Sequence, residues 1–518
     1  MGTKKFQLKK NKTLVIGTAA TPTSADPDFG HSYLDSQLYT NMHDTMIKYK
    51  AVPYPWDERL AKMGVTIDDG HNFLPNLCES WSNSPDEKTI SFKLRKGVKG
   101  HWGDELTTAD TIYTINRGFE IKASIFFLFS SIAGLPSSKH CRVIDKYTFE
   151  FNIPNPTGVT LKLLCLPWIA HFDHLIAEKK ASAKDAWALR WMTKNSCSWG
   201  PYRIKEWKAG KQVTLEASDD YWQGELKIEK VICKAIPERS TRVALLERGR
   251  IDIADLLLPQ DIEYLWGKKG IKIMSTRSNG VYYLLMNCQM KPFDDIRVRR
   301  AMNYACPQQE IVSTVFHGLA EPMNSPCSPL QPGYTGEFWQ YGYNPDMAAR
   351  LLAEAGYPKG FEVELFFTDN SPAEEEVCVI IRKALKKIKV DVKLRKLSVA
   401  SFNRILYKKK HLFASRLDFP AVRDPTYWGL WFKSHTFLNY QDLRDAELDN
   451  LLDEQASITD MNERMGISKK VQKRILDLAP MVFIAYPTTN IAMRTDIGGK
   501  YHVNPDCISY YWRDLEKA

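Results

Sequence analysis

One segment in the C-terminal third of the chain crowds charged and aromatic side chains together. Residues 414–432 read ASRLDFPAVRDPTYWGLWF, with acids at Asp418 and Asp424 and arginines at Arg416 and Arg423. A carboxylate can pair with a cationic ligand group, whereas the planar guanidinium of arginine matches a carboxylate, sulfonate or phosphate. These groups could bind charged partners, and the alternative is that Arg423 pairs with Asp424 or Asp418 inside the loop.

The chain lacks the motifs of common enzyme classes. We find no G-x-S-x-G, no G-x-x-x-x-G-K-[ST] and no G-x-G-x-x-G after a strand. The acids at 68–69 and 374–376 lie at turns and helix starts, where electrostatics at the helix N-terminus accounts for them. His171 and His174 have the spacing of a metal pair but no third ligand nearby. We therefore expect no catalytic residue, metal or cofactor, and keep an enzyme only as an alternative.

Composition is typical of a large globular protein. The 518 residues exceed one ordinary core, so we expect two or three structural units. Hydrophobic residues at 44% and charged residues at 25% argue against disordered, collagen-like and membrane classes. The net charge of +10 is modest for this length, and no recognisable nucleic-acid-binding module is present. We therefore expect no nucleic-acid partner.

The sequence also bears on membrane segments, export and cysteines. No apolar run of 18 residues exists, so no spanning helix is expected. The start MGTKKFQLKKNKTLVIGTAA is basic but continues into a strand pattern, so we interpret an export signal as absent from this sequence. The ten cysteines are scattered without a C-x-x-C spacing; most are expected to be small buried hydrophobic residues, and no disulfide pairing can be assigned.

Strand and helix patterns alternate from end to end. Period-two spacing predicts strands in TISFKL, YTFEFNI, QVTLEA and FEVELF. A helix is predicted in YNPDMAARLLAEAGYP, with Asn344 as N-cap, Pro345 at its first position and Gly356 as its stop. Two further helices are predicted in STRVALLERGRIDIAD and DDIRVRRAMNYAC. The alternation predicts an α/β protein, and the lack of flexible linkers is typical of hinge proteins.

Several of these blocks together resemble a known family. LPNLCESWSNSPDEKTISFKLRKGVKGHWGDELTTADTIYTINR, residues 74–117, resembles the most recognisable block of the family-five extracytoplasmic solute-binding proteins, the peptide-, dipeptide- and nickel-binding receptors of ABC importers. SWGPYRIKEWKAGKQVTLEASDDYWQG, STRVALLERGRIDIAD and PFDDIRVRRAMNYA follow in that family's order. The resemblance covers about residues 13–515, essentially the whole chain.

The resemblance implies a two-lobed α/β periplasmic-binding-protein fold of the larger type. Lobe one would comprise residues 1–274 and 486–518, with an extra subdomain at about residues 47–187, and lobe two residues 275–485. A ligand that stabilises the closed form gives a membrane permease a state to distinguish. The implied function is that of a non-catalytic receptor delivering a peptide-like or other polar or anionic small molecule to an ABC importer by hinge closure.

The resemblance also implies partners and a location. The receptor is expected to be a monomer, in the periplasm or at the cell surface, whose partners are its ligand and a pair of ABC permease subunits. Alternative ligands within the family are opine-like conjugates, oligosaccharides and nickel chelates. An alternative function is the ligand-sensing domain of a regulator or chemosensory receptor.

The first-lobe contacts follow from an Asp-Pro pair. In the family, the loop after the first strand contacts the ligand beyond such a pair, which here is Asp26 and Pro27. The predicted contacts are His31, Ser32 and Tyr33. Phe127 is a further candidate, in the aromatic patch at residues 126–129, and a core position is the alternative for at least two of the three phenylalanines there.

The second-lobe contact in the family is a G-W-x-x-D-Y-x-D-P loop, whose first Asp pairs with the free α-amine of a peptide. This sequence departs from that pattern, because Ala421 replaces the acid, Val422 the aromatic, and Arg423 precedes the shared Asp424 and Pro425. Burying an unpaired amine costs on the order of several kcal/mol. The departure therefore argues against an ordinary peptide.

Asp418 keeps the peptide hypothesis open, because a three-residue shift of the loop would let it replace the missing acid. Arg423 would instead favour an anionic group. The predicted second-lobe contacts are Arg416, Asp418, Phe419, Arg423, Asp424 and Trp428.

Overall fold

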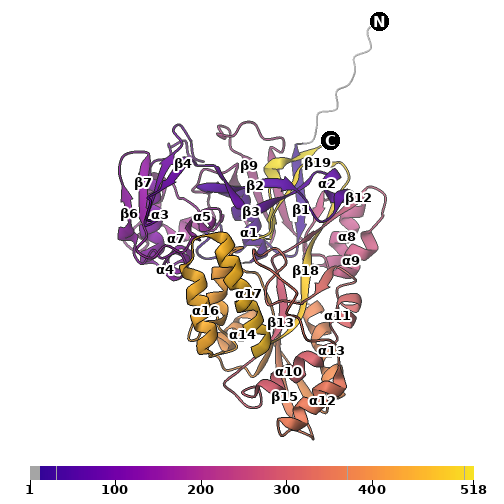
Figure 1. Cartoon of the computed structure of the whole chain (residues 1–518). Coiled ribbons are helices and arrows are strands. Elements are labelled where there is room, and N and C mark those ends of the chain that lie inside the picture. Colours follow the sequence, from indigo (N-terminus) through magenta and orange to yellow (C-terminus); the bar gives the residue numbers. More distant parts are fainter. Residues whose placement is uncertain (1–11, 31, 370–371, 507) are drawn as a thin grey trace. The chain divides into compact units, whose positions relative to one another are not determined.

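The computed structural model describes residues 12–30, 32–369, 372–506 and 508–518. The chain divides into two compact units, which we name the first and the second unit. The first unit comprises Met1–Leu257, Tyr264–Met274 and Asn490–Ala518, and the second comprises Leu258–Glu263 and Ser275–Thr489. The C-terminal segment, drawn in yellow in Figure 1, therefore belongs to the same unit as β1 near the start of the chain.

The first unit contains a mixed sheet with the strand order β11-β1-β10-β9-β8. β1 is parallel to β10 and β11, whereas β9 is antiparallel to its two neighbours. Leu14 and Ile16 of β1 point into the core, as the alternation of a half-buried strand requires. The strands are β1 (Thr13–Thr18), β8 (Tyr202–Lys208), β9 (Gln212–Ala217), β10 (Lys230–Ala235) and β11 (Ile253–Ala254).

The C-terminal segment completes a second sheet of the first unit, ordered β2-β3-β20-β21. β20 pairs in parallel with β3 although more than 400 residues separate them in sequence. Trp512 just beyond is fully buried and packs edge-on against Tyr202. These elements are β2 (Ile47–Pro53), β3 (Val65–Pro75), β20 (Tyr501–Asn504), β21 (Ser509–Tyr510), with the separate pair β19 (Ile497–Gly499) and β22 (Leu515–Lys517).

Residues 78–152 of the first unit contain a separate four-stranded sheet, ordered β4-β5-β7-β6. Its core is aromatic, with the rings of Phe92 and Phe149 stacked at 5.1 Å and Phe151 edge-on to both. The strands are β4 (Cys78–Asn83), β5 (Thr89–Leu94), β6 (Cys141–Val143) and β7 (Thr148–Asn152). The helices of the first unit are α1 (Tyr33–Met42), α2 (Glu58–Lys62), α3 (Thr108–Glu120), α4 (Ser124–Ser131), α5 (Thr160–Leu163), α6 (His174–Lys180), α7 (Leu189–Met192) and α8 (Arg239–Glu247).

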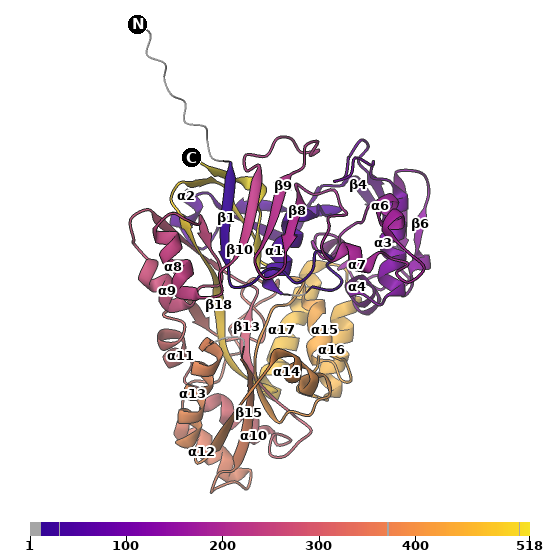
Figure 2. The same ribbon diagram turned by 180° about the vertical axis from the view of Figure 1, so that it is seen from behind.

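The second unit has a sheet ordered β16-β15-β17-β13-β18, with β14 also paired to β18. Figure 2 labels β13, β15 and β18 of this sheet. Its strands are β13 (Val281–Met286), β14 (Ala320–Pro322), β15 (Glu362–Thr368), β16 (Asp391–Leu397) and β17 (Phe413–Asp418). Its helices are α10 (Ile296–Tyr304), α11 (Gln308–Thr314), α12 (Pro345–Glu354), α13 (Pro372–Lys386), α14 (Val399–Tyr407), α15 (Trp428–Phe432), α16 (Ala446–Ser457) and α17 (Met461–Leu478). Three elements include a boundary between the units: α9 (Pro259–Leu265), β12 (Ile271–Arg277) and β18 (Met481–Arg494).

The local sequence patterns predicted these elements well. The four predicted strands are β5, β7, β9 and β15, and the three predicted helices are α8, α10 and α12. The Asn344 side chain accepts a hydrogen bond from the Met347 amide, Pro345 is the first residue of α12, and Gly356 just beyond has a φ of +92°. The α/β class is confirmed. In the described part of the chain, we find no helix with the length and apolarity needed to cross a membrane.

We predict that Asn344→Ala lowers the free energy of unfolding by about 1 kcal/mol, because α12 loses its N-cap acceptor. Asn344→Asp keeps an acceptor at the same place and is the matched control, with an unfolding free energy close to that of wild type. Urea denaturation measures both. Equal losses in the two variants would contradict the capping role.

Candidate functional site

The loop between β1 and α1 is held against the start of that helix by Asp35. The Asp35 carboxylate accepts hydrogen bonds from the Ser32 hydroxyl at 2.6 Å and from the amide and hydroxyl of Thr23 at 2.6 and 2.9 Å. Ser32 in turn caps α1 by accepting from the Asp35 amide. The polar groups of Ser32 therefore serve the helix start, while its side chain remains exposed.

The same loop is tied to α3 by a buried ion triad. The Arg117 guanidinium, fully buried, donates to the carboxylates of both Asp26 and Asp28 and lies 4.6 Å from the ring centre of Phe172. Burial raises the pKa of Asp26 to about 6, although the Arg117 charge acts in the opposite direction. The Asp26 carboxylate of the Asp-Pro pair therefore stabilises the loop through its ion pair with Arg117.

The other first-lobe candidates have different environments. His31 lies outside the described residues. The Tyr33 hydroxyl is buried, and burial together with the nearby Asp255 charge raises its pKa well above the usual value. Phe127 on α4 is half-buried, whereas Phe129 belongs to the core and packs edge-on against Phe151.

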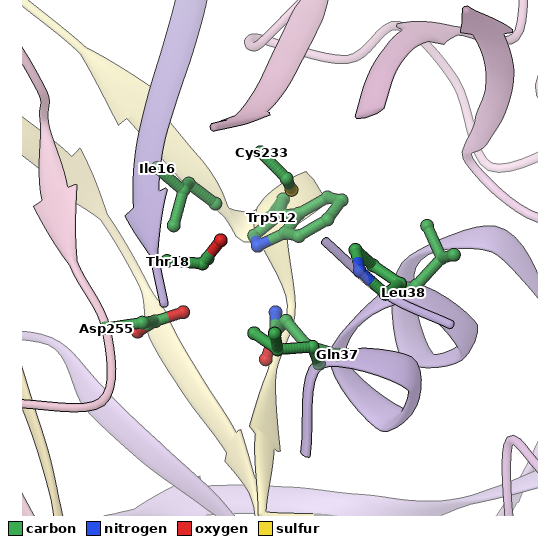
Figure 3. Close-up of a pocket in the computed structure, with 9 residues that line it drawn as sticks. Ile16, Thr18, Gln37, Leu38, Cys233, Asp255 and Trp512 are labelled. Atoms are coloured by element: carbon green, nitrogen blue, oxygen red, sulfur yellow. The ribbon is translucent and has the colours of Figure 1, made fainter. Parts of the chain in front are cut away.

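A small cavity lies in the first unit where the side chains of Thr18, Gln37 and Asp255 converge from β1, from α1 and from just beyond β11 (Figure 3). The cavity has a volume of about 10 Å³, which is room for about one group the size of a water molecule. Asp255 is fully buried, and neither carboxylate oxygen accepts a hydrogen bond of ordinary geometry. Burial raises the pKa of Asp255 to about 7, and the hydroxyls of Tyr33 and Tyr510 offset this only in part.

The charged loop predicted in the second unit follows β17 and is held by two buried amides. The Asn279 side chain donates to the Pro420 carbonyl at 2.8 Å, and the Gln331 side chain donates to the Val422 carbonyl at 3.3 Å. Gln331 also donates to the Asn279 side-chain oxygen at 3.1 Å. Both sides of Ala421 are thereby fixed to a rigid support.

The Asp-Pro pair of this loop is part of its support. Asp424 accepts from the Thr426 amide at 2.9 Å and so caps the short 3₁₀ turn Pro425–Tyr427. Arg464 of α17 lies 3.3 Å from the Asp424 carboxylate and donates to the Thr426 hydroxyl. Both charged side chains are buried. Trp428, the first residue of α15, is also almost fully buried.

Arg416 and Asp418 at the end of β17 form an internal cluster. Asp418 accepts from Arg416 Nε at 2.6 Å and from the Tyr283 hydroxyl at 2.5 Å. The Arg416 guanidinium also lies 4.9 Å from the ring centre of Tyr440. Burial alone would lower the pKa of Arg416, but its interactions with Asp418, Tyr283 and Tyr440 together outweigh burial and raise that pKa. Asp418 is therefore already engaged by a cation and a hydroxyl.

Phe419 and Arg423 are the remaining predicted residues of this loop. The Phe419 ring packs on the backbone of Gly280, where one ring carbon lies 2.5 Å from the position a Cβ would take. Arg423 is only 3% exposed and so places a guanidinium inside the loop. Asp418 forms an ion pair with Arg416, and Asp424 forms one with Arg464.

His171 and His174, the histidines with the spacing of a metal pair, have separate roles. His174 is the first residue of α6, and its Nδ1 lies 2.7 Å from the Asp110 carboxylate of α3. His171 is buried, and burial lowers its pKa to about 3. Among the described residues, no group of three or more His, Cys, Asp or Glu side chains is placed to hold a metal ion. The nine cysteines that the structure describes are all buried, and none of them is in a disulfide.

Sequence reasoning missed the residues that support the two loops, because their partners are remote in sequence. Asn279, Gln331 and Arg464 carry no local signal. Asp255 did carry one, since it is an acid placed directly after a short buried strand.

Comparison with known proteins places this geometry in a family. The profile described as bacterial extracellular solute-binding proteins, family 5 Middle, matches residues 72–439. The chain belongs to this family of extracellular solute-binding proteins. The family 5 chain is 26% identical to the dipeptide-binding protein of Escherichia coli (strain K12), over 95% of this chain and 92% of that one.

Two solved structures show that the family 5 fold extends over the whole chain. One is the ABC transporter-associated periplasmic binding protein DppA from Helicobacter pylori in complex with the peptide STSA, with a TM-score of 0.81, 23% identity and 98% of each chain covered. The other is AgaA from A. tumefaciens R10 in complex with agropinic acid, with a TM-score of 0.79, 22% identity and coverage of 98% and 99%. The expected fold class is confirmed, and the protein is a non-catalytic binding protein.

We predict that Arg117→Leu destabilises the protein by about 3–5 kcal/mol near pH 8, because it leaves two buried carboxylates without their cation. The loss should be smaller near pH 5, since the raised pKa of Asp26 lets that carboxyl bind a proton in the folded state. Urea denaturation at the two pH values measures the difference.

Arg142→Leu is the matched control, because Arg142 pairs with Glu150 on the same segment but is 70% exposed. Its unfolding free energy should stay close to that of wild type at both pH values. A loss for Arg117→Leu that did not depend on pH would contradict the proposed electrostatic origin.

Proposed function

We propose that this protein is the solute-binding receptor of an ABC importer and carries a peptide-like or other polar or anionic small molecule. The observation that carries the proposal is similarity along the whole chain to a dipeptide-binding protein, with 95% of this chain and 92% of that one covered. The DppA and AgaA structures, which are complexes with a peptide and with agropinic acid, support the breadth of the solute class. An ABC permease pair is the membrane partner that we propose.

The second-unit loop favours a solute with an anionic group. Its acids Asp418 and Asp424 are engaged by Arg416 and Arg464, and Ala421 has no charge to offer an amine. Arg423 places a guanidinium inside this loop, and a guanidinium binds a carboxylate in a bidentate manner. A carboxylate belongs equally to a peptide C-terminus and to an opine, so both classes satisfy this loop.

Release to a permease requires that the bound and free receptor differ. We propose that solute binding shifts the arrangement of the two units, because a solute can favour one arrangement only through its different affinity for the two. Small-angle scattering with and without the solute measures this shift as a decrease in the radius of gyration. An unchanged radius with saturating solute would contradict closure.

The receptor function is tested by mass spectrometry under native conditions on the purified protein, followed by a thermal-shift screen. The screen compares di- to pentapeptides with organic acids, opine-like conjugates, oligosaccharides and nickel chelates. A true solute stabilises the folded protein by about 2.7 kcal/mol at a concentration 100 times its Kd. Stabilisation by organic acids alone would exclude peptides, and a saturating response to none of these classes would contradict the proposed function.

Arg423→Ala is predicted to weaken binding of the solute by more than about tenfold, because a charge-assisted pair is lost inside a buried loop. Arg423→Lys keeps the charge without the fork and should fall between Ala and wild type. Arg404→Ala, at an exposed position of α14, is the control and should bind like wild type. Isothermal titration calorimetry measures all three, and wild-type affinity in Arg423→Ala would refute the role.

A further inference from the structure

The cavity beside β1 combines an apolar wall with one buried acid, which the hydroxyls of Tyr33 and Tyr510 face without a hydrogen bond of ordinary geometry. Its lining residues are Ile16, Thr18, Pro22, Leu34, Gln37, Leu38, Cys233, Asp255 and Trp512 (Figure 3). Asp255 is the one carboxylate among them, and it is fully buried with both oxygens lacking a hydrogen bond of ordinary geometry. Buried carboxylates normally have a hydrogen-bonding or ionic partner, because an unpaired buried charge is costly.

The Arg242 guanidinium does not donate a hydrogen bond of ordinary geometry to Asp255. The Arg242 guanidinium contributes a charge that lowers the pKa of Asp255, but it donates to the backbone carbonyls of Ile236, Pro237 and Leu256 at 2.6–3.0 Å. It is therefore tied to main-chain acceptors of its own. The arrangement leaves the carboxylate able to accept a donor that enters the cavity.

The other polar groups around the cavity favour a donor as the occupant. The Thr18 hydroxyl donates to the Ala20 carbonyl at 2.6 Å, so its oxygen retains lone pairs for an incoming N–H. The Gln37 amide is already used, since it donates to the Tyr510 carbonyl and accepts from the Tyr510 amide. The Trp512 ring adds an aromatic surface of the kind that attracts a cation.

We propose that this cavity is a subsite for the protonated primary amine of a ligand, with Asp255 as its counter-ion and the Thr18 hydroxyl as a further acceptor. An ammonium group is about the size of a water molecule, which matches the void. It carries three N–H donors, which the two carboxylate oxygens and a hydroxyl can accept. The apolar wall of Ile16, Leu34 and Leu38 suits the carbon that bears the amine.

The assignment of the amine to the transported solute rests on the proposed function. The binding of an amine in the cavity is independent of that function. Methylammonium is therefore the first probe, because it contains only the recognised group and one carbon. We expect methylammonium chloride to raise the Tm of the wild-type protein saturably above an equal concentration of sodium chloride. Tetramethylammonium has no N–H donor and a larger volume, and should behave like sodium.

Asp255→Asn should weaken the methylammonium response at least about tenfold, because the counter-ion is removed while the shape of the side chain is kept. In the absence of amine, the same variant should have a higher Tm than wild type near pH 8, because an unpaired buried charge has been eliminated. A purely structural role for the carboxylate would instead lower the Tm.

Asp252→Asn is the matched control three residues upstream. Asp252 accepts from the Val15 amide at 2.8 Å and pairs with Lys517 at 2.8 Å, so its charge is engaged within the fold. The variant should lower the Tm and leave the methylammonium response unchanged.

The response should also weaken as pH falls from near 8 to near 6, because Asp255 has a pKa raised to about 7 and loses its charge over this range. The groups facing it from the neighbouring elements are Tyr33, Tyr501, Tyr510, Cys233 and Arg242. Burial raises the pKa of the three tyrosines and of Cys233, so these remain neutral, and Arg242 remains charged. Asp255 is thus the group in this set that titrates between the two pH values.

The outcomes separate this subsite from the proposed transport function. A methylammonium response in wild type that is lost in Asp255→Asn supports the subsite even if no solute is found in the screen. No response beyond that of sodium, or an equal response in Asp255→Asn, overturns it. If a solute is found, its N-acetylated form should bind at least about tenfold more weakly, and equal binding would overturn the assignment of the amine to the solute.

Discussion

Burial of ionised side chains is the constraint on which both loops of this protein depend. Arg117 neutralises part of the charge of Asp26 and Asp28 and in doing so ties the loop after β1 to α3. Arg464 does the same for Asp424 and the loop after β17. In each case one arginine from a distant helix replaces the water that the loop acids lose, so the loop cannot rearrange without exposing or unpairing a charge.

The contrast between two acids of the first unit shows what an engaged and an open carboxylate look like. Asp44 is buried and accepts from the Tyr221 hydroxyl at 2.9 Å, the Trp222 indole at 2.8 Å and the Arg513 guanidinium at 2.9 Å. Asp255 has the same burial but no such set of donors. The fold can therefore provide a buried carboxylate with a full set of hydrogen-bond donors. The lack of such a set is specific to the surroundings of Asp255.

Local patterns predicted the elements, and the ordered motifs predicted the fold. The strands β5, β7, β9 and β15 followed from period-two spacing, and the ends of α12 from Asn344, Pro345 and Gly356, because these signals act over a few residues. The α/β binding-protein fold followed from the order of the motifs along the chain, which the family match confirms.

The support of the sites could not be predicted in this way. Tyr510 meets Asp255 across some 255 residues of sequence, and Arg464 meets Asp424 across 40. Such pairs are fixed by the tertiary fold and leave no periodicity to detect. The segment 414–432 was noticed for its charges, but only the structure shows Asp418 held by Arg416 and Tyr283, and Asp424 by Arg464.

The return of the C-terminal segment into the first unit has a consequence for how the protein is made. The second sheet of that unit lacks β20 and β21, and its core lacks Trp512, until residues 501–512 have been synthesised. Domains normally fold during synthesis in order from the N-terminus. Here the unit that starts first must finish last, because the main part of the second unit, Ser275–Thr489, is complete before it. The first unit of a nascent chain therefore stays incomplete while the main part of the second unit is already available to fold.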